Sequence, residues 1–324
     1  MHRDPPARRP VGVRECFGLA PLGKAAREAL VAIRGGEGIP PTRFDRSSLR
    51  MLDPRLSLPV WLGRTRADRL VPILNMFNHT PTPIEEGWSV RIRQVRDFRG
   101  GRLTYDSHNG TDFCVPVGTV VVAAAPGRVL RVSSEFHRGG LKVFIDHGRG
   151  LVTSSNHLAR ALVSTGDVVA RGEPIALAGA SGLDLFTFFP WLCPHVHFNV
   201  FLDGRHVDPF SIGPDEPSMW RGATGMPVPD DGGGADADLD PADWDDAGVD
   251  RAIESCLHDE TRRALGAIVG AEQRAMAVLF HTAYFPTRFG ARAELYARAH
   301  QRRAWLDLPF SRHQFDGIAL PQSG

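Results

Sequence analysis

The feature of this 324-residue chain that most constrains its fold is a series of short apolar segments within residues 86–215. The stretch "GTVVVAAAPGRVLRVSS" predicts two short strands around Pro126-Gly127, and "GGLKVFIDHGRGLVTSS" predicts another pair that turns at Gly148 and Gly150. Short apolar stretches with Gly and Pro turns about every ten residues are typical of a barrel or a sandwich. The sequence therefore predicts a compact β domain.

An arginine- and proline-rich region, residues 1–85, precedes the β domain. Its segment "LGKAAREALVAIRGG" has helical periodicity and ends at two glycines, so we expect a helix there. The apolar residues expected to share one face of this helix are Leu22, Ala26, Leu30 and Ile33. We interpret the region as an accessory layer or arm and assign it no chemistry.

Two further regions follow the β domain. Residues 216–250 are interpreted as an acidic flexible linker, because the part from 222 to 250 holds nine Asp and no Lys or Arg and has too little apolar sequence to order itself. Residues 251–324 are expected to be helical, with one amphipathic segment in "DETRRALGAIVGAEQRAMAVLFHTAYF" and a second in "TRFGARAELYARAHQRRAWLDL". The predicted fold class is therefore α+β, a compact β domain with helical N- and C-terminal flanking regions.

The balance of charges gives no strong global field. The chain has 38 Lys plus Arg and 37 Asp plus Glu, a formal net charge of +1 at pH 7, so we expect no nucleic-acid partner. Its four cysteines form no closely spaced ligand pair and are too few for a disulfide scaffold; we expect buried free thiols. No segment approaches the ~18 apolar residues of a membrane span, so no integral membrane segment is predicted.

The N-terminus is basic, but Arg and Glu interrupt it throughout, and it lacks the apolar core of a signal peptide. We therefore expect no signal peptide of the ordinary kind. The expected location is cytoplasmic, unless export uses another route or the start codon is wrongly assigned. The sequence gives no indication of the oligomeric state.

The stretch "SHNGTDF" places an imidazole and a carboxylate four residues apart. His108 and Asp112 are both suitable zinc ligands. Gly110 between them argues against a helix and allows the backbone a tight turn. A single pair is weak evidence, so a metal site needs partners elsewhere in the chain.

The stretch "PHVHFNVF" supplies two possible partners, His195 and His197. If it is a strand, we expect the two side chains to diverge, which suggests one direct ligand and one neighbour at the edge of the site. With His108 and Asp112, one of them would complete three protein ligands, which suits a catalytic zinc whose fourth position is left for water. His157, in "TSSNHLAR", is a candidate acid or base near the metal.

Six motifs in a fixed order carry a family resemblance: "HNGTD", "IDHGRG", "NHLAR", "STGDVVARGEPIALAGASG", "HVHF" and "GRHVDP". Together they resemble the lysostaphin/LytM-type zinc metallopeptidases, which cut peptide bonds in bacterial cell-wall peptidoglycan. The resemblance covers roughly residues 95–212, about a third of the chain. It implies a small, mostly antiparallel β catalytic domain.

The resemblance also implies roles for individual residues. His108 and Asp112 match the first two zinc ligands of the family, and His197 matches the third. His195 and His157 match the two catalytic histidines that flank the metal. We assign His195 as base and His157 as the partner of the oxyanion or the leaving group, and the reverse assignment stays open.

The function implied is a Zn²⁺-dependent endopeptidase whose substrate is a peptidoglycan peptide, in a cross-link or a stem, or another peptide. The alternative is a catalytically silent domain of this type that serves as a binding or regulatory module for another cell-wall hydrolase. The enzyme is favoured because all three ligands and both catalytic histidines are present. A biotinyl or lipoyl carrier is disfavoured because its hairpin needs a lysine that is absent here, and a phosphocarrier because it would not need Asp112.

This sequence departs from the family pattern in three places. Ser155 stands where the family often has an aromatic hydroxyl, which puts one transition-state hydrogen bond in doubt, and Asn199 stands where an acid is frequent. The segment "LDLFTFFPWLCP" before H-x-H is longer than usual. Its aromatic residues would either form an apolar lip over the groove or pack against the flanking regions: Phe186, Phe188, Phe189 and Trp191.

Overall fold

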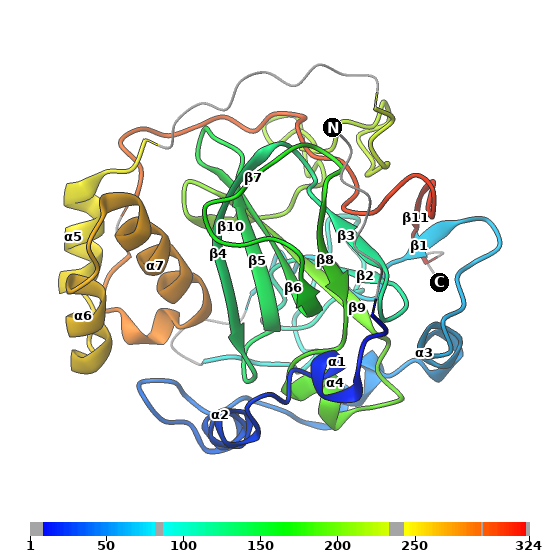
Figure 1. Ribbon diagram of the computed structural model, residues 1–324, viewed down its shortest axis with the longest axis horizontal. Helices are drawn as coiled ribbons and strands as arrows, with labels where there is room; N and C mark the ends of the chain where they lie inside the picture. Colours follow the sequence, from blue (N-terminus) through cyan, green and yellow to red (C-terminus); the bar gives the residue numbers. More distant parts are fainter. Residues whose placement is uncertain (1–8, 82–86, 233–242, 293, 322–324) are drawn as a thin grey trace.

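The computed structural model describes residues 9–81, 87–232, 243–292 and 294–321, and its centre is a nine-stranded sheet (Figure 1). The strands of this sheet are β2 (Thr111–Cys114), β3 (Val120–Val122), β4 (Gly127–Glu135), β5 (Gly140–Asp146), β6 (Leu151–Ala161), β7 (Val168–Val169), β8 (Pro174–Ala178), β9 (His195–Leu202) and β10 (Arg205–Val207). The main path runs β10-β9-β6-β5-β4-β7, while β2 pairs with β9 and β8 pairs with both β6 and β3. All these pairs are antiparallel.

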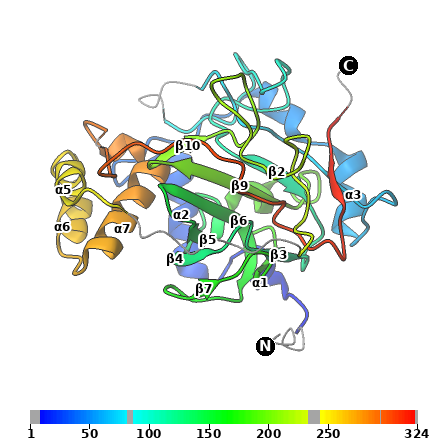
Figure 2. The same cartoon turned by 90° about the horizontal axis from the view of Figure 1, so that it is seen from above.

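Helices surround the sheet, and all but one of the described helices belong to the N- and C-terminal regions; the exception lies between β8 and β9. They are α1 (Val13–Cys16), α2 (Leu22–Arg34), the 3-10 helix η1 (Arg46–Met51), α3 (Pro54–Trp61), α4 (Leu183–Thr187), α5 (Asp246–Glu254), α6 (Asp259–Gly266), α7 (Ala271–Tyr284) and the 3-10 helix η3 (Pro286–Arg288). Helices α5 to α7 gather on one side of the sheet and α3 lies on the opposite side of the molecule (Figures 1 and 2). The predicted α+β class with a mostly antiparallel sheet is confirmed.

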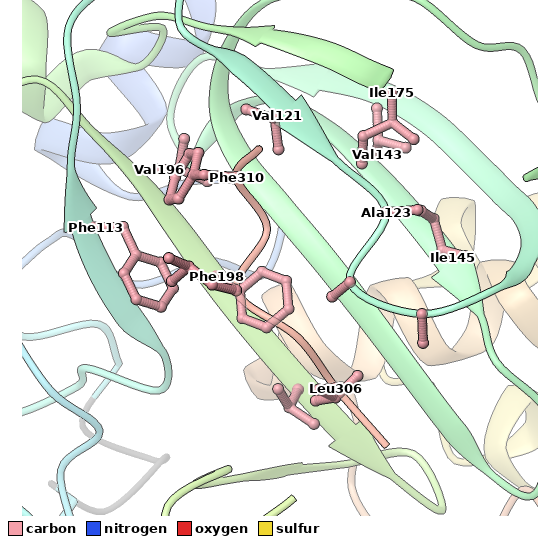
Figure 3. Close-up of a cluster of buried hydrophobic side chains, with 14 of the residues drawn as sticks. Phe113, Val121, Ala123, Val143, Ile145, Ile175, Val196, Phe198, Leu306 and Phe310 are labelled. Carbon is pink, nitrogen blue, oxygen red and sulfur yellow. The ribbon is translucent and has the colours of Figure 1, made fainter. Parts of the chain in front are cut away.

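Alternation along β9 separates a core face from a polar face. Val196, Phe198 and Val200 are at most 1% exposed and belong to the main hydrophobic core (Figure 3). The residues between them, among them His197 and Asn199, therefore lie on the other face of the strand. Burial of each large apolar side chain stabilises the fold by about 1.5–3 kcal/mol, so the register that places the polar row on the face away from the core is strongly fixed.

The C-terminal end of the chain is part of this core. Leu306 and Phe310 are fully buried among the strands (Figure 3), and Phe310 forms a β-bridge with Val121. Strand β11 (Gly317–Ala319) pairs in parallel with β1 (Leu70–Pro72), the one parallel pair among the described strands. The N- and C-terminal regions are thus joined to each other and to the β domain.

The helix predicted near the N-terminus is present as α2, but its predicted buried face is wrong. Leu22, Leu30 and Ile33 are 55%, 49% and 65% exposed, whereas Ala25 and Ala32 are buried. The helix therefore makes its close contacts through small residues, which a pattern of large apolar residues does not reveal.

The predicted C-terminal helices are partly correct. The first segment forms α6 and α7, separated by Gly270 at a φ of 98°, and Val269 in the break is 92% exposed. The second segment, residues 287–308, is wrong as a helix, because the described part has no helix beyond η3. Its backbone pairs elsewhere: the Leu306 N–H donates to the Met219 carbonyl at 2.8 Å. Tertiary pairing overrides the amphipathic pattern there.

The segment assigned to an acidic linker, residues 216–250, includes 233–242, which lie outside the described residues. Before that gap, Trp220 is 1% exposed and belongs to the main core. After it, α5 begins at Asp246, where the Asp245 side chain accepts a hydrogen bond from the first turn of the helix.

All four cysteines are buried and free, which confirms their predicted state. Within the described ranges, no helix has the length and apolar character needed to cross a membrane. We therefore assign no chemistry to the four buried cysteines.

Asp146, at the end of β5, leads to a prediction about stability. Burial raises the pKa of its carboxyl to about 6, above an ordinary value of 3.8. The folded protein therefore holds more protons than the unfolded chain between about pH 4 and pH 6, and the free energy of unfolding falls as the pH rises through that window. Asp146→Asn keeps the oxygen that accepts from the Gly148 N–H and removes the charge. We expect the variant to be roughly 2–3 kcal/mol more stable than wild type at pH 8.

Chemical denaturation at pH 4.5, 6 and 8 tests this expectation. At pH 4.5 the advantage of the variant should shrink to about 1 kcal/mol, because the folded wild-type carboxyl is then protonated and only the unfolded one is largely ionised. An advantage of the variant that is the same at all three pH values would contradict the assigned cause.

Candidate active site

Three side chains predicted as metal ligands converge at the polar face of β2 and β9. His108 Nε2 lies 3.1 Å from both Asp112 Oδ1 and His197 Nδ1, and the last two atoms are 2.8 Å apart. Asp112 is directly opposite His197 in the antiparallel ladder, which explains how residues so far apart in the chain meet. The three form a cluster able to hold a metal ion in the described part of the chain.

The hydrogen bonds around this cluster leave its inner atoms available to a cation. His108 Nδ1 donates to the Met76 carbonyl at 2.5 Å, so its Nε2 keeps a lone pair. Asn75 donates to Asp112 Oδ2 at 2.7 Å, which leaves Oδ1 for the cluster. Zinc holds nitrogen and oxygen ligands at about 2.0–2.2 Å, and donors this close together fit one such ion.

Position 110 needs a glycine because the site has no room for a side chain there. A Cβ on it would lie 2.6 Å from the Phe198 carbonyl oxygen and 2.8 Å from His197 Nε2. Its φ is outside the left-handed region, so the tight turn that we expected is not the reason for a glycine. A side chain there would push His197 out of place.

His195 lies on the same face of β9 as His197, so the expected divergence of the two side chains is wrong. Residues i and i+2 of a strand share a face, and Val196 between them points into the core. His195 Nδ1 donates to the Cys193 carbonyl at 2.8 Å. Its Nε2 therefore has a free lone pair, and it lies 3.6 Å from Asp112 Oδ1.

His157 reaches the same cluster from β6 through an irregular backbone. Its φ is 60°, which is unusual for a residue with a side chain, and the register of β6 shifts next to it. Such a bulge re-aims a side chain. The ring lies 4.8 Å from that of His195, and Nδ1 donates to the Ser181 carbonyl at 2.8 Å, which again leaves Nε2 with a lone pair.

Comparison with known families agrees with this geometry. Residues 106–209 match the family model described as Peptidase family M23. The chain carries an M23 peptidase domain. All five candidate residues lie within the match, so the M23 domain contains the whole cluster.

Relatives of the M23 domain include cell-wall enzymes. Peptidoglycan DD-endopeptidase ShyB of Vibrio cholerae is 40% identical over 101 residues, 31% of this chain and 22% of ShyB. A protein of Haemophilus influenzae named uncharacterized metalloprotease is 37% identical over 105 residues, 32% of this chain and 21% of that protein. A solved zinc-containing peptidase from Vibrio cholerae is 30% identical to this chain, with a TM-score of 0.33. The match covers 48% of this chain and 42% of the solved chain. The match spans about a fifth of the length of these two curated relatives.

Electrostatics of the M23 domain favour a charged carboxylate at Asp112 and neutral rings at His157 and His197. Burial by itself raises the pKa of Asp112, but the charges of His108 and His195 and its hydrogen bonds hold that pKa well below the usual range. Burial lowers the pKa of His197 and lowers the pKa of His157 to about 4, against the opposing effect of Asp184. At neutral pH the rings of His157 and His197 are therefore suited to bind a metal or accept a proton.

A cavity of about 380 Å³ lies over the cluster, and the regions outside the M23 domain supply part of its wall. The N-terminal region, to which we assigned no chemistry, contributes Ala32, Ile33, Thr42, Phe44 and Met51. Helix α7 contributes Tyr284. Access to the candidate ligands therefore depends on segments far from the motifs.

The aromatic residues in and after α4 bear out both interpretations that the sequence left open: some line the cavity and others pack on the N-terminal region. Phe188 lines the cavity and stacks on Phe44 of the N-terminal region. Phe186 and Phe189 make edge-to-face ring contacts with Phe17 of the N-terminal region. Both side chains remain about half exposed. Trp191 is 50% exposed and is absent from the cavity wall.

Several residues around the M23 site escaped the sequence reasoning. Asn199, noted only as a departure, has its Nδ2 2.9 Å from His197 Nε2. Its Oδ1 accepts from Asn156 at 2.9 Å and from the Tyr284 hydroxyl at 3.0 Å. Nothing in the sequence indicated Tyr284, because its helix lies outside the motifs.

Ser155 and Tyr105 change the expectation about a hydroxyl at the site. Ser155 pairs with Phe198, a core residue, so it lies on the core face of the sheet and its short reach is not the issue. Tyr105 lines the cavity, and its ring is 4.6 Å from that of His108. Burial, with a further contribution from Asp112, raises the pKa of its hydroxyl well above the usual value, so the group keeps its proton.

Proposed function

We propose that this protein is a zinc-dependent endopeptidase that hydrolyses peptide bonds in bacterial peptidoglycan cross-links or stem peptides. The observation that carries the proposal is the convergence of three metal-type donors with two imidazoles whose free nitrogens lie beside them. The name of ShyB, a DD-endopeptidase of peptidoglycan, supports the choice of substrate.

His108, Asp112 and His197 would hold the ion. Zinc bound there lowers the pKa of a coordinated water molecule and polarises a carbonyl group. The Asp112 carboxylate offsets part of the charge of the ion, and its hydrogen bond from Asn75 keeps it oriented. Three protein ligands are typical of catalytic zinc, whereas structural sites have four.

His195 is assigned as the base that takes the proton of the attacking water. Its Nε2 lies near the Asp112 oxygen that faces the cluster, and its tautomer is fixed by the Cys193 carbonyl. His157 is assigned to the leaving amine: its Nε2 has a lone pair in the resting site, and Asp184 Oδ2 at 3.8 Å from that nitrogen stabilises the ring once it has taken up a proton for transfer to the amine. General acid and base groups of this kind each contribute typically 10²–10⁴-fold to the rate.

Tyr105 is assigned as a hydrogen-bond donor to the oxyanion. Its hydroxyl keeps its proton and lines the cavity next to His108. Donors placed where negative charge develops stabilise the transition state more than the ground state. The aromatic hydroxyl that we expected at the position of Ser155 would thus be supplied by Tyr105, from a different segment of the chain.

The test is cleavage of purified peptidoglycan by the full chain, with mass analysis of the products. We expect about one zinc per chain, cleavage that stops on chelation and returns with zinc, and products that identify the bond. Zinc at full occupancy without cleavage of wall or defined peptides would contradict the enzyme and support the silent binding module.

A further inference from the structure

Arg138 is a buried cation in the wall of the cavity without a carboxylate partner. Its side chain lines the cavity and the residue is 8% exposed. Its Nε has no hydrogen-bond partner, and one terminal nitrogen donates at 3.2 Å to the adjacent His137 carbonyl. No ion pair joins it to any acidic residue that the structure describes; the charge of Asp184 acts on it from a longer distance.

The backbone holds Arg138 next to the catalytic histidines. It lies at the tip of the β4–β5 hairpin, where Gly139 and Gly140 adopt φ values of 70° and 60°. The Gly139 carbonyl accepts from the His157 N–H at 2.8 Å, and the Arg138 carbonyl accepts from the buried Lys142 amine at 2.6 Å. The hairpin tip is therefore anchored to the residue that we assign as acid.

The surroundings of the Arg138 guanidinium favour binding of an anionic ligand. Its central carbon lies 5.3 Å from the centre of the Trp88 ring, which orients the planar group without neutralising it. Burial lowers its pKa to about 10, so it remains charged at neutral pH. A buried charge without a partner is costly, and a guanidinium presents paired donors that match a carboxylate.

Asp184 is the acidic residue that would be expected to satisfy Arg138, but its position serves another group. Its Oδ2 lies 3.8 Å from His157 Nε2, and its side chain is 45% exposed. The cavity wall therefore holds the Asp184 carboxylate next to His157 and, separately, the Arg138 guanidinium. The two charged groups do not form an ion pair with each other.

We propose that Arg138 binds a free carboxylate of the substrate, so that the preferred substrates are peptides with a carboxylate close to the scissile bond. This inference rests on the proposed peptidase function, because it concerns the same groove. The carboxylate has two possible sources, the C-terminus of the peptide or an acidic group on an internal residue. Both present the same chemistry to the guanidinium.

Matched peptides test the proposal. One pair differs in a C-terminal carboxylate against a carboxamide, and the other in an internal Glu against Gln. For wild type we expect amidation to lower kcat/KM at least about 10-fold in one pair, and the pair that responds identifies the source. In Arg138→Gln that difference should disappear, with the amide peptide still cleaved at a similar rate. Arg138→Lys keeps the positive charge but loses the paired donors of the guanidinium. It should retain part of the preference for the acid peptide.

Arg131→Gln is the matched control, because Arg131 lies on the same hairpin, is paired with Glu135 and is absent from the cavity wall. It should leave the preference for the carboxylate unchanged. Equal cleavage of acid and amide peptides by wild type in both pairs would overturn the proposal. So would an Arg138→Gln variant that loses the same factor on both members of the responsive pair.

Equilibrium binding separates this inference from the proposed function. The same peptide pairs are titrated calorimetrically against zinc-loaded His195→Ala, with and without Arg138→Gln. A preference for the acid of 10-fold or more that needs Arg138 supports carboxylate binding even if the wild type cleaves none of the peptides. Binding without that preference overturns it, whatever the protein hydrolyses.

Discussion

His108→Ala should yield a folded protein that binds zinc more than 100-fold more weakly and no longer cleaves peptide bonds. The substitution removes one of three donors and leaves only Asp112 and His197 facing each other. Loss of a residue that merely supports a ligand costs 10–100-fold in metal affinity, so the loss of a ligand itself should exceed that. Zinc content after dialysis and competition with a chelator measure the effect. His79→Ala, which affects a histidine paired with Asp208 away from the cluster, should keep full zinc occupancy.

His195→Ala should separate binding from chemistry. Its Nε2 is beside the cluster but is not one of the three converging donors. We therefore expect normal zinc content and a fall in kcat of about 10²–10⁴-fold. Zinc lost together with activity would make His195 a ligand, and cleavage at the wild-type rate by either the His108 or the His195 variant would contradict the assigned roles.

The convergence of the three candidate ligands was predictable because its geometry follows from strand pairing. The alternating pattern of β9 fixes which face His197 occupies, and the pairing of β2 with β9 brings Asp112 opposite to it. The motif order identified the residues without showing this register. The mistaken divergence of His195 and His197 came from misapplying the period of a strand, which is two residues.

The rest of the site depends on contacts that a linear pattern does not contain. The position of His157 requires a bulge and a left-handed backbone. Asn75 and Met76 support the cluster from a region without motifs, and Tyr284 arrives from α7. These contacts are set by how the flanking regions pack on the sheet, and the same packing explains why the predicted face of α2 failed.

Asn199 carries a further expected effect on zinc binding, because it is the polar neighbour of the candidate ligand His197. When His197 binds a metal through Nδ1, its Nε2 carries a proton and needs an acceptor, which usually is a carboxylate, a carbonyl or water. Asn199 Nδ2 is 2.9 Å from that nitrogen, and the amide oxygen reaches it only after a half-turn that gives up the hydrogen bonds to Asn109 and from Asn156. Asn199→Ala removes this group, so zinc affinity should fall about 10–100-fold.

Asn199→Asp separates loss of the acceptor from loss of the side chain. The carboxylate has nearly the same shape and offers an oxygen to His197 in either orientation, while Asn156 and Tyr284 can donate to its other oxygen. Zinc affinity should therefore stay closer to that of wild type than in Asn199→Ala, although the new oxygen faces the Asn109 carbonyl oxygen to which the wild-type amide donates. Tyr284→Phe removes one donor to Asn199 and should weaken zinc binding less than Asn199→Ala. If the alanine variant binds zinc as tightly as wild type, His197 is oriented by packing alone and the amide has no part in the site.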